Sequence, residues 1–180
     1  MRRSLAAVAL VCVALTLEAS AAGDDITVRS LTRDDQILVS FTLTGGFTRE
    51  LRDAIRSGLP ATITYEVDLR RGSSLWFDRT LASARVIAAV RYDNLTRQYR
   101  LSLTIDGRGE APQITEDEDT VREWMTDFKR LPLFATAALE RNVEYSVRVR
   151  ARTRPRVNWF LFWPWEQDVA TGSHRFTFVQ

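Results

Sequence analysis

The strongest constraint in this sequence is the alternation of apolar and polar residues, which recurs in short segments separated by turn-forming residues. Residues 62–71 show it most clearly, because every second residue from Ile63 to Leu69 is apolar and the residues between them are polar. Successive side chains of a β-strand point to opposite faces, so this pattern predicts a strand with one buried face. Similar segments lie at residues 26–31, 37–43, 86–92, 99–105, 145–151 and 175–178.

Turn-forming residues stand where these predicted strands end. Gly45-Gly46 follows one strand, the tetrapeptide at 93–96 joins two strands as a hairpin, and Asp106-Gly107 turns the chain again. Such residues readily adopt the backbone conformations of tight turns. We expect about seven or eight strands in all.

Two short helices interrupt the strands. The first is predicted to begin after Thr48, a good N-cap residue, and to end at Gly58, just before Pro60. The second is predicted from a capping box formed by Thr115 and Glu118. Its apolar residues follow helical spacing at Val121, Trp124, Met125 and Phe128.

Together these elements predict a mostly β protein, an antiparallel β-sandwich of about seven or eight strands with two short helices. We expect the helices to lie over sheet edges or at an open end. A strongly curved sheet holding one helix is the alternative. The sequence contains neither an internal repeat nor a long linker, so we expect a single domain over residues 23–180.

Residues 1–22 are typical of a cleaved secretory signal peptide. Arg2 and Arg3 precede an apolar run at residues 5–17, which is followed by small residues at 19–22. The run is about 13 residues long, too short to span a bilayer as a helix. We therefore assign 1–22 to a signal peptide and expect the protein to be periplasmic.

Cysteine usage and net charge exclude several classes of function. Cys12 is the only cysteine, and it lies inside the predicted signal peptide. The exported protein would then lack thiols, which excludes disulfides, thiolate metal ligands and cysteine nucleophiles. The formal net charge of the whole sequence is only +2, which predicts no nucleic-acid partner.

Motifs in the middle of the chain resemble a bacterial family known only as domain of unknown function 4390. They are Phe41-Thr42-Leu43 before the first helix, Ser57-Gly58-Leu59-Pro60, the strand at 62–71, Trp76-Phe77-Asp78, and residues 92–96 followed by Tyr99. The resemblance implies a small exported protein of the Gram-negative envelope, often encoded near sensor kinases. It implies no catalytic residues, and the C-terminal part of the chain departs from the family's usual ending.

Residues suited to catalysis or metal binding are sparse. His174 is the only histidine, whereas nucleophilic hydrolases and zinc sites usually need histidine beside a nucleophile or another ligand. Glu66 and Asp68 share a strand face, and residues 116–119 are all acidic. We interpret the pair as surface charges and the acidic run as a helix start. We therefore expect that the protein is not an enzyme and that it has no catalytic or metal-binding residue and no cofactor.

The most distinctive feature is an arginine at every second position of one strand, which we call the arginine ladder. It consists of Arg148, Arg150, Arg152, Arg154 and Arg156. These side chains lie on the same side of the strand, so their charges repel one another. Carboxylates such as Glu66 and Asp68, anionic lipid headgroups or an acidic partner protein could offset them. A solvated strand face with cross-strand ion pairs is the plainest interpretation.

Directly after the ladder, residues 159–165 are almost entirely apolar or aromatic. In a strand, Phe160 and Phe162 would face one way, and Trp159 and Trp163 the other, so one sheet face cannot bury both sets. Either a helix or loop covers the second side, or that side is a contact surface, because tryptophan and arginine are enriched at interfaces.

These observations lead to the hypothesis of a non-catalytic envelope protein that binds a protein partner. The outer portion of a sensor kinase is one candidate partner. The alternative is a peripheral envelope protein that binds anionic lipid or lipid-linked ligands. The candidate contact surface comprises Arg148, Arg150, Arg152, Arg154, Trp159, Trp163 and Trp165.

The signal-peptide assignment predicts the N-terminus of the exported protein. Cleavage after the small residues should leave a chain that begins near Ala22 or Gly23. Intact-mass measurement on protein isolated from the cell envelope checks this, and a chain that retains Met1 would contradict the assignment.

Overall fold

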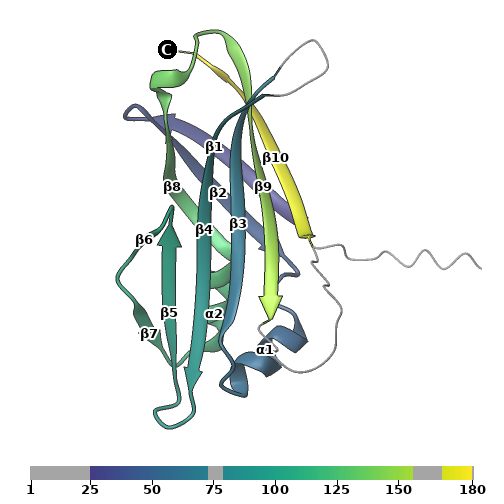
Figure 1. The fold of residues 1–180 in the computed structure, drawn as a ribbon, viewed down its shortest axis with the longest axis vertical. Coiled ribbons are helices and arrows are strands. Elements are labelled where there is room, and N and C mark those ends of the chain that lie inside the picture. Colours follow the sequence, from purple (N-terminus) through teal and green to yellow (C-terminus); the bar gives the residue numbers. More distant parts are fainter. Residues whose placement is uncertain (1–24, 73–78, 156–167, 180) are drawn as a thin grey trace, which may run out of the picture.

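The computed structural model describes residues 25–72, 79–155 and 168–179 (Figure 1). The predicted signal peptide at 1–22 lies outside the described residues. Within these ranges, no helix is long and apolar enough to cross a membrane.

The described chain forms ten strands, two α-helices and one 3₁₀ helix. Their bounds are β1 Asp25–Arg33, β2 Gln36–Thr44, α1 Arg49–Arg56, β3 Ala61–Arg71, β4 Arg79–Asp93, β5 Gln98–Ile105, β6 Arg108–Gly109, β7 Gln113–Thr115, α2 Glu118–Thr126, β8 Asp127–Ala135, the 3₁₀ helix η1 Thr136–Ala138, β9 Val143–Pro155 and β10 Asp168–Phe178. Only β6 and β7, of two and three residues, are very short. The remaining strands agree with the predicted number.

The strands form two antiparallel sheets. One has three strands in the order β1-β2-β8, and the other has seven, in the order β10-β9-β3-β4-β5-β6 with β7 also pairing with β5. Figure 1 shows the seven-stranded sheet in front, the three-stranded sheet behind it and α1 at the lower end. The predicted antiparallel β-sandwich with two short helices is thus confirmed.

The sheets share one core because their strands bury alternate residues. In β3, the side chains of Ile63, Tyr65 and Val67 are completely buried, whereas those of Thr64 and Glu66 are partly exposed. The neighbouring strands alternate in the same way. Their inward residues include Ile37, Val39, Phe41, Val86, Ala88, Val90, Val147, Val149 and Ala151.

The two sheets approach each other most closely where β1 meets β10. A β-carbon built on Gly172 of β10 would overlap the carbonyl oxygen of Ile26 in β1. Farther along the same two strands, Ser30 Oγ and His174 Nδ1 lie 2.9 Å apart. Only glycine leaves room for the backbones at this seam, so the close approach depends on Gly172.

α2 packs between the two sheets, in contact with β4 and β5 on one side and β2 and β8 on the other. Val121 and Met125 on its inner face are completely buried. The Tyr65 hydroxyl donates a 2.8 Å hydrogen bond to the carbonyl oxygen of Met125. Because burial raises the pKa of the Tyr65 phenol, this donor stays protonated and holds the helix to β3.

α2 is shorter than the sequence predicts. It ends at Thr126, and Phe128 lies in β8 rather than in the helix. The chain leaves the helix because β8 pairs with β2, where Thr42 Oγ1 also donates a 2.9 Å hydrogen bond to Asp127 Oδ1. Phe128 is still buried, with its ring centroid 4.7 Å from that of Phe41.

The cap of α2 also differs from the predicted capping box of Thr115 and Glu118. Asp117 is the N-cap residue, and its carboxylate accepts hydrogen bonds from two backbone N–H groups in the first turn. Glu118 forms ion pairs with Arg52 at 2.7 Å and with Arg56 at 2.6 Å, both on α1. These charged partners draw Glu118 away from the cap, and they join the two helices.

α1 and the hairpin turns agree with the predictions. Thr48 Oγ1 accepts a hydrogen bond from the Leu51 N–H at 3.2 Å, and Gly58 has a left-handed φ of 84° after the helix. Asp106 and Gly107 both have positive φ, 48° and 79°, as a two-residue type I′ hairpin requires.

The β1–β10 seam predicts that Gly172→Ala is strongly destabilising. Its methyl group overlaps backbone rather than a flexible side chain, so the free energy of unfolding should fall by about 2–3 kcal/mol. Gly109→Ala is the matched control, because a β-carbon there meets nothing within 4 Å. Urea unfolding of both variants tests this, and equal midpoints would show that the seam does not require glycine.

Candidate functional site

The described members of the arginine ladder, Arg148, Arg150 and Arg152, lie on the outer face of the seven-stranded sheet. The partner strand β3 presents outward-facing carboxylates beside it, because Asp68 stands opposite Arg148 and Glu66 stands opposite Arg150. The residue opposite Arg152 is Thr64. The register of two adjacent strands therefore brings basic and acidic residues together from positions about eighty apart in the chain.

The described ladder arginines form a continuous ion-pair network with these carboxylates. Arg150 Nη2 bridges the two acids, at 3.0 Å from Asp68 Oδ2 and 3.3 Å from Glu66 Oε2. Arg148 Nη2 lies 3.5 Å from Asp68 Oδ2, and Arg152 Nη1 lies 3.3 Å from Glu66 Oε1. The carboxylates suggested by the sequence thus offset a large part of the ladder's charge.

Asp68 is the buried centre of this network. Its side chain is 8% exposed, whereas the three arginines keep between 28% and 32% of their side-chain surface exposed. Ser83 on β4 donates a 2.8 Å hydrogen bond to Asp68 Oδ1. The acid is therefore held by groups from both neighbouring strands, while the guanidinium groups remain accessible from solvent.

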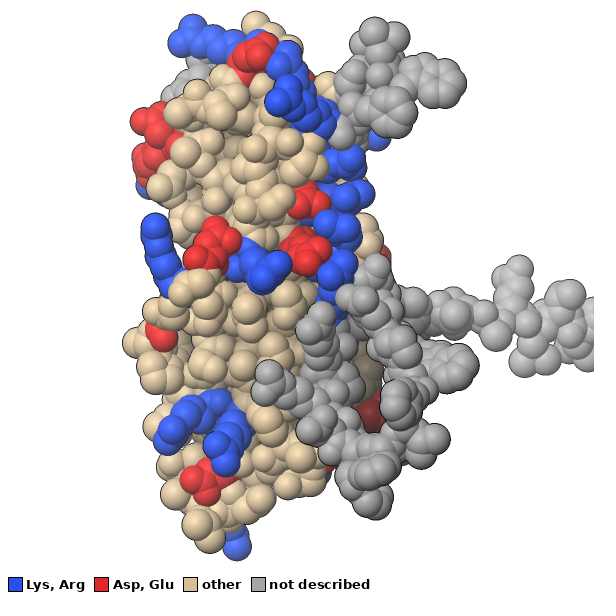
Figure 2. Space-filling model, in the orientation of Figure 1, with Lys and Arg blue, Asp and Glu red and all other residues tan. Residues whose placement is uncertain are grey.

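A further arginine lies on this face beside the network. The side chain of Arg85 on β4 is exposed opposite Glu66. Figure 2 shows blue and red groups alternating across the middle of the sheet face, with a further blue and red group near the lower end.

A hollow of about 510 Å³ lies beside the network on the same face. Its lining includes the carboxylates of Glu66, Asp68 and Asp106 together with the guanidinium groups of Arg85 and Arg150. The hollow is therefore lined by both signs of charge, an arrangement suited to a polar surface of matching pattern.

The remaining members of the candidate contact surface are not described in full. The backbone of Arg154 pairs with Thr62, but its side chain lies outside the described part. Trp159, Trp163 and Trp165 also lie outside the described residues. Their contribution to a contact surface stays a prediction.

The other polar residues considered from the sequence occupy structural positions. His174 lies at the β1–β10 seam with Ser30 as its hydrogen-bond partner. The acidic run at 116–119 spans the start of α2, with Asp117 as its N-cap. Among the described residues, no group of three or more His, Cys, Asp or Glu side chains could hold a metal ion.

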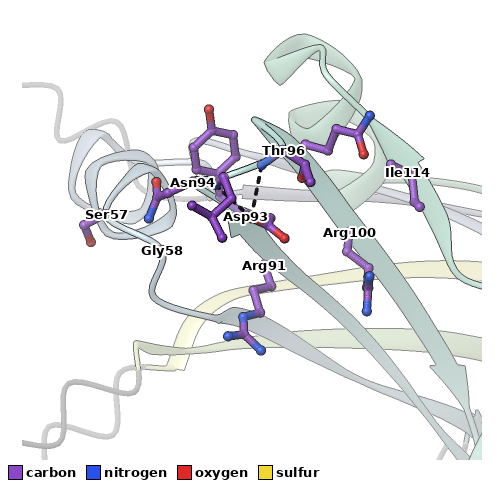
Figure 3. A pocket seen from close by; sticks show the side chains of 11 residues that line it. Ser57, Gly58, Arg91, Asp93, Asn94, Thr96, Arg100 and Ile114 are labelled. Atoms are coloured by element: carbon purple, nitrogen blue, oxygen red, sulfur yellow. Dashed lines mark hydrogen bonds between the residues drawn. The ribbon is translucent and has the colours of Figure 1, made fainter.

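A second group of arginines, which the sequence pattern did not indicate, lies near the tip of the β4–β5 hairpin. Arg91 and Arg100 stand directly opposite each other on these strands, beside a cavity of about 540 Å³. Figure 3 shows both side chains projecting from the hairpin, with Ile114 of β7 beyond Arg100. Counting outward from the predicted turn at 93–96 would pair Arg91 with Gln98, whereas the loop lies at 94–97 and places Arg91 opposite Arg100.

The fold and this site define a mostly β sandwich protein whose larger sheet has an outer face rich in arginine. The chain belongs to the family described as Domain of unknown function (DUF4390), which matches residues 19–173. No curated protein and no solved structure matches the chain.

The network predicts that Asp68→Asn destabilises the protein. Removing this charge leaves Arg148 and Arg150 short of a counter-ion in a partly buried setting, so the free energy of unfolding should fall by about 2–3 kcal/mol. Glu140→Gln is the control, because Glu140 pairs with Arg71 at an exposed position and should matter far less. Urea unfolding measures both, and an unchanged midpoint for Asp68→Asn would show that the network adds no stability.

Proposed function

We propose that this protein is a non-catalytic binding protein of the bacterial envelope that engages a protein partner through the outer face of its seven-stranded sheet. The surface centres on Arg148, Arg150 and Arg152. One observation carries the proposal: the three arginines lie side by side on this face, and each keeps roughly 30% of its side-chain surface exposed. Their guanidinium groups are therefore accessible to an acidic partner.

The mixed charge of the face favours a protein over an anionic bilayer. A bilayer surface attracts groups of uniformly positive charge, and it would repel Glu66, Asp68 and Asp106 in the adjoining hollow. A folded partner can place an acid against each exposed guanidinium and a donor against each carboxylate. This complementarity also opposes partners of the wrong pattern, which supports selective binding.

Neighbouring sequence extends the proposed surface. β9 ends at Pro155, and Trp159, Trp163 and Trp165 follow shortly after it in the chain. Tryptophan beside arginine is the combination most enriched among residues that dominate binding energy at protein interfaces. The outer portion of an envelope sensor kinase is the partner class that the family resemblance suggests.

A double substitution, Arg148→Gln with Arg152→Gln, tests the proposal. It keeps Arg150, which bridges Asp68 and Glu66, and removes two positive charges from the proposed surface. Affinity for the partner captured from envelope extract should fall about tenfold or more, as measured by surface plasmon resonance with the purified partner. Arg175→Gln is the control, because Arg175 lies on the adjacent strand β10 with its side chain 80% exposed.

Two results would count against this assignment. Unchanged affinity of a correctly folded double variant would remove the ladder from the interface. Flotation with anionic vesicles that is lost in the double variant and kept in Arg175→Gln would instead favour the lipid-binding alternative.

A further inference from the structure

Arg91 and Arg100 form a cross-strand pair of like charges at the lower end of the seven-stranded sheet. They are direct partners in the β4–β5 register, and both are exposed. Directly opposed side chains have β-carbons roughly 5 Å apart, so two positive charges there destabilise the hairpin. Within the described part of the chain, neither arginine forms an ion pair of the kind that offsets the ladder.

Asp93 interacts electrostatically with both arginines, and it offsets only part of their charge. It lies two residues from Arg91 on β4, so both side chains share a face. Its Oδ1 accepts hydrogen bonds from the backbone N–H groups of Leu95 at 2.9 Å and Thr96 at 3.3 Å. These hydrogen bonds, with smaller contributions from the two arginines, lower the pKa of Asp93. Asp93 is thus held by the backbone of the turn, and its single negative charge balances at most one of the two arginines.

The surroundings of the pair are concave and partly apolar. Arg91 and Arg100 line the cavity of about 540 Å³ together with Leu95, which is 95% exposed, and Ile114, which is 61% exposed. Ile114 is the register partner of Arg100 on β7, so the row across the sheet reads arginine, arginine, isoleucine. Figure 3 shows the two guanidinium groups on one side of the hairpin, away from its turn.

We infer that Arg91 and Arg100 bind a phosphate group in this cavity. A phosphate group has enough oxygens to accept paired hydrogen bonds from two guanidinium groups at once. The two oxygens of a carboxylate are both used by the paired hydrogen bonds of one guanidinium group. A bound phosphate would convert the repulsion between the arginines into two attractions. The exposed Leu95 and Ile114 beside them suit a phosphate carried by an apolar molecule, such as a lipid headgroup, and a soluble phosphate is the other source.

This site is separate from the proposed protein-binding surface. Arg91 is six residues from Arg85 along β4, which corresponds to about 20 Å in an extended strand. The two sites can therefore be removed independently, and failure of one assignment leaves the other intact.

The test uses the protein as isolated from the envelope and the double variant Arg91→Gln with Arg100→Gln. Isothermal titration with inorganic phosphate and with pyrophosphate measures the soluble source, and flotation with phosphatidylglycerol vesicles measures the lipid source. Wild-type protein should bind at least one of these probes, and the double variant should bind it at least about tenfold more weakly. Arg85→Gln, which removes one positive charge from β4 outside the cavity, should bind as the wild type does.

Stability without a probe controls for folding. The double variant should unfold at the same or a higher temperature than the wild type, because it loses a like-charge pair. The probe that binds should raise the unfolding temperature of the wild type and leave that of the variant unchanged. If the double variant does not fold, the single variant Arg100→Gln replaces it in every arm.

Each outcome decides the inference. Binding to vesicles alone supports the site and assigns it to a lipid headgroup, and binding to soluble phosphates alone supports it with a soluble ligand. Three results overturn it: no binding of any probe by the wild type, equal binding by the arginine variant, or equal binding of sulfate and phosphate. Preferential binding of a glutamate-rich peptide would also overturn it, in favour of an acidic protein segment.

Discussion

The pairing of β3 with β4 on one edge and β9 on the other is the constraint on which both faces of the large sheet depend. Inward residues of β3 such as Tyr65 and Val67 are completely buried, and this burial sets which residues face outward. A slip of one residue would move Glu66 and Asp68 into the core. Burial of the apolar residues therefore holds the carboxylates beside the arginine ladder.

Arginines occupy two different electrostatic environments on the same sheet. Along β9, strand pairing brings Arg148, Arg150 and Arg152 beside carboxylates, while parts of these guanidinium groups remain accessible. At the β4–β5 hairpin, strand pairing brings Arg91 against Arg100 and adds repulsion. The first arrangement suits a patterned protein surface, and the second suits a compact anion that contacts both arginines.

The helices support the end of the sheet that carries the hairpin. Glu118 joins α2 to α1 through Arg52 and Arg56, and the residues after α1 line the same cavity as the hairpin. Gly58 approaches Asn94 so closely that a β-carbon there would lie 2.8 Å from the Asn94 amide nitrogen. The shape of the cavity thus depends on the ion pairs between the helices as well as on the hairpin itself.

Local sequence by itself determined the strands with clear alternation, α1, the turn at Asp106-Gly107 and the common outward direction of Arg148, Arg150 and Arg152. Each of these features depends on residues near one another in the chain. The tertiary structure decided which strands are neighbours. It placed Phe128 in β8 rather than in the predicted helix, and it paired Glu118 with arginines of α1 rather than with the helix cap. It also placed Arg91 directly opposite Arg100. The physical reason is that hydrogen bonding between strands and ion pairing between helices join distant residues, and these contacts outweigh local propensity wherever the two disagree.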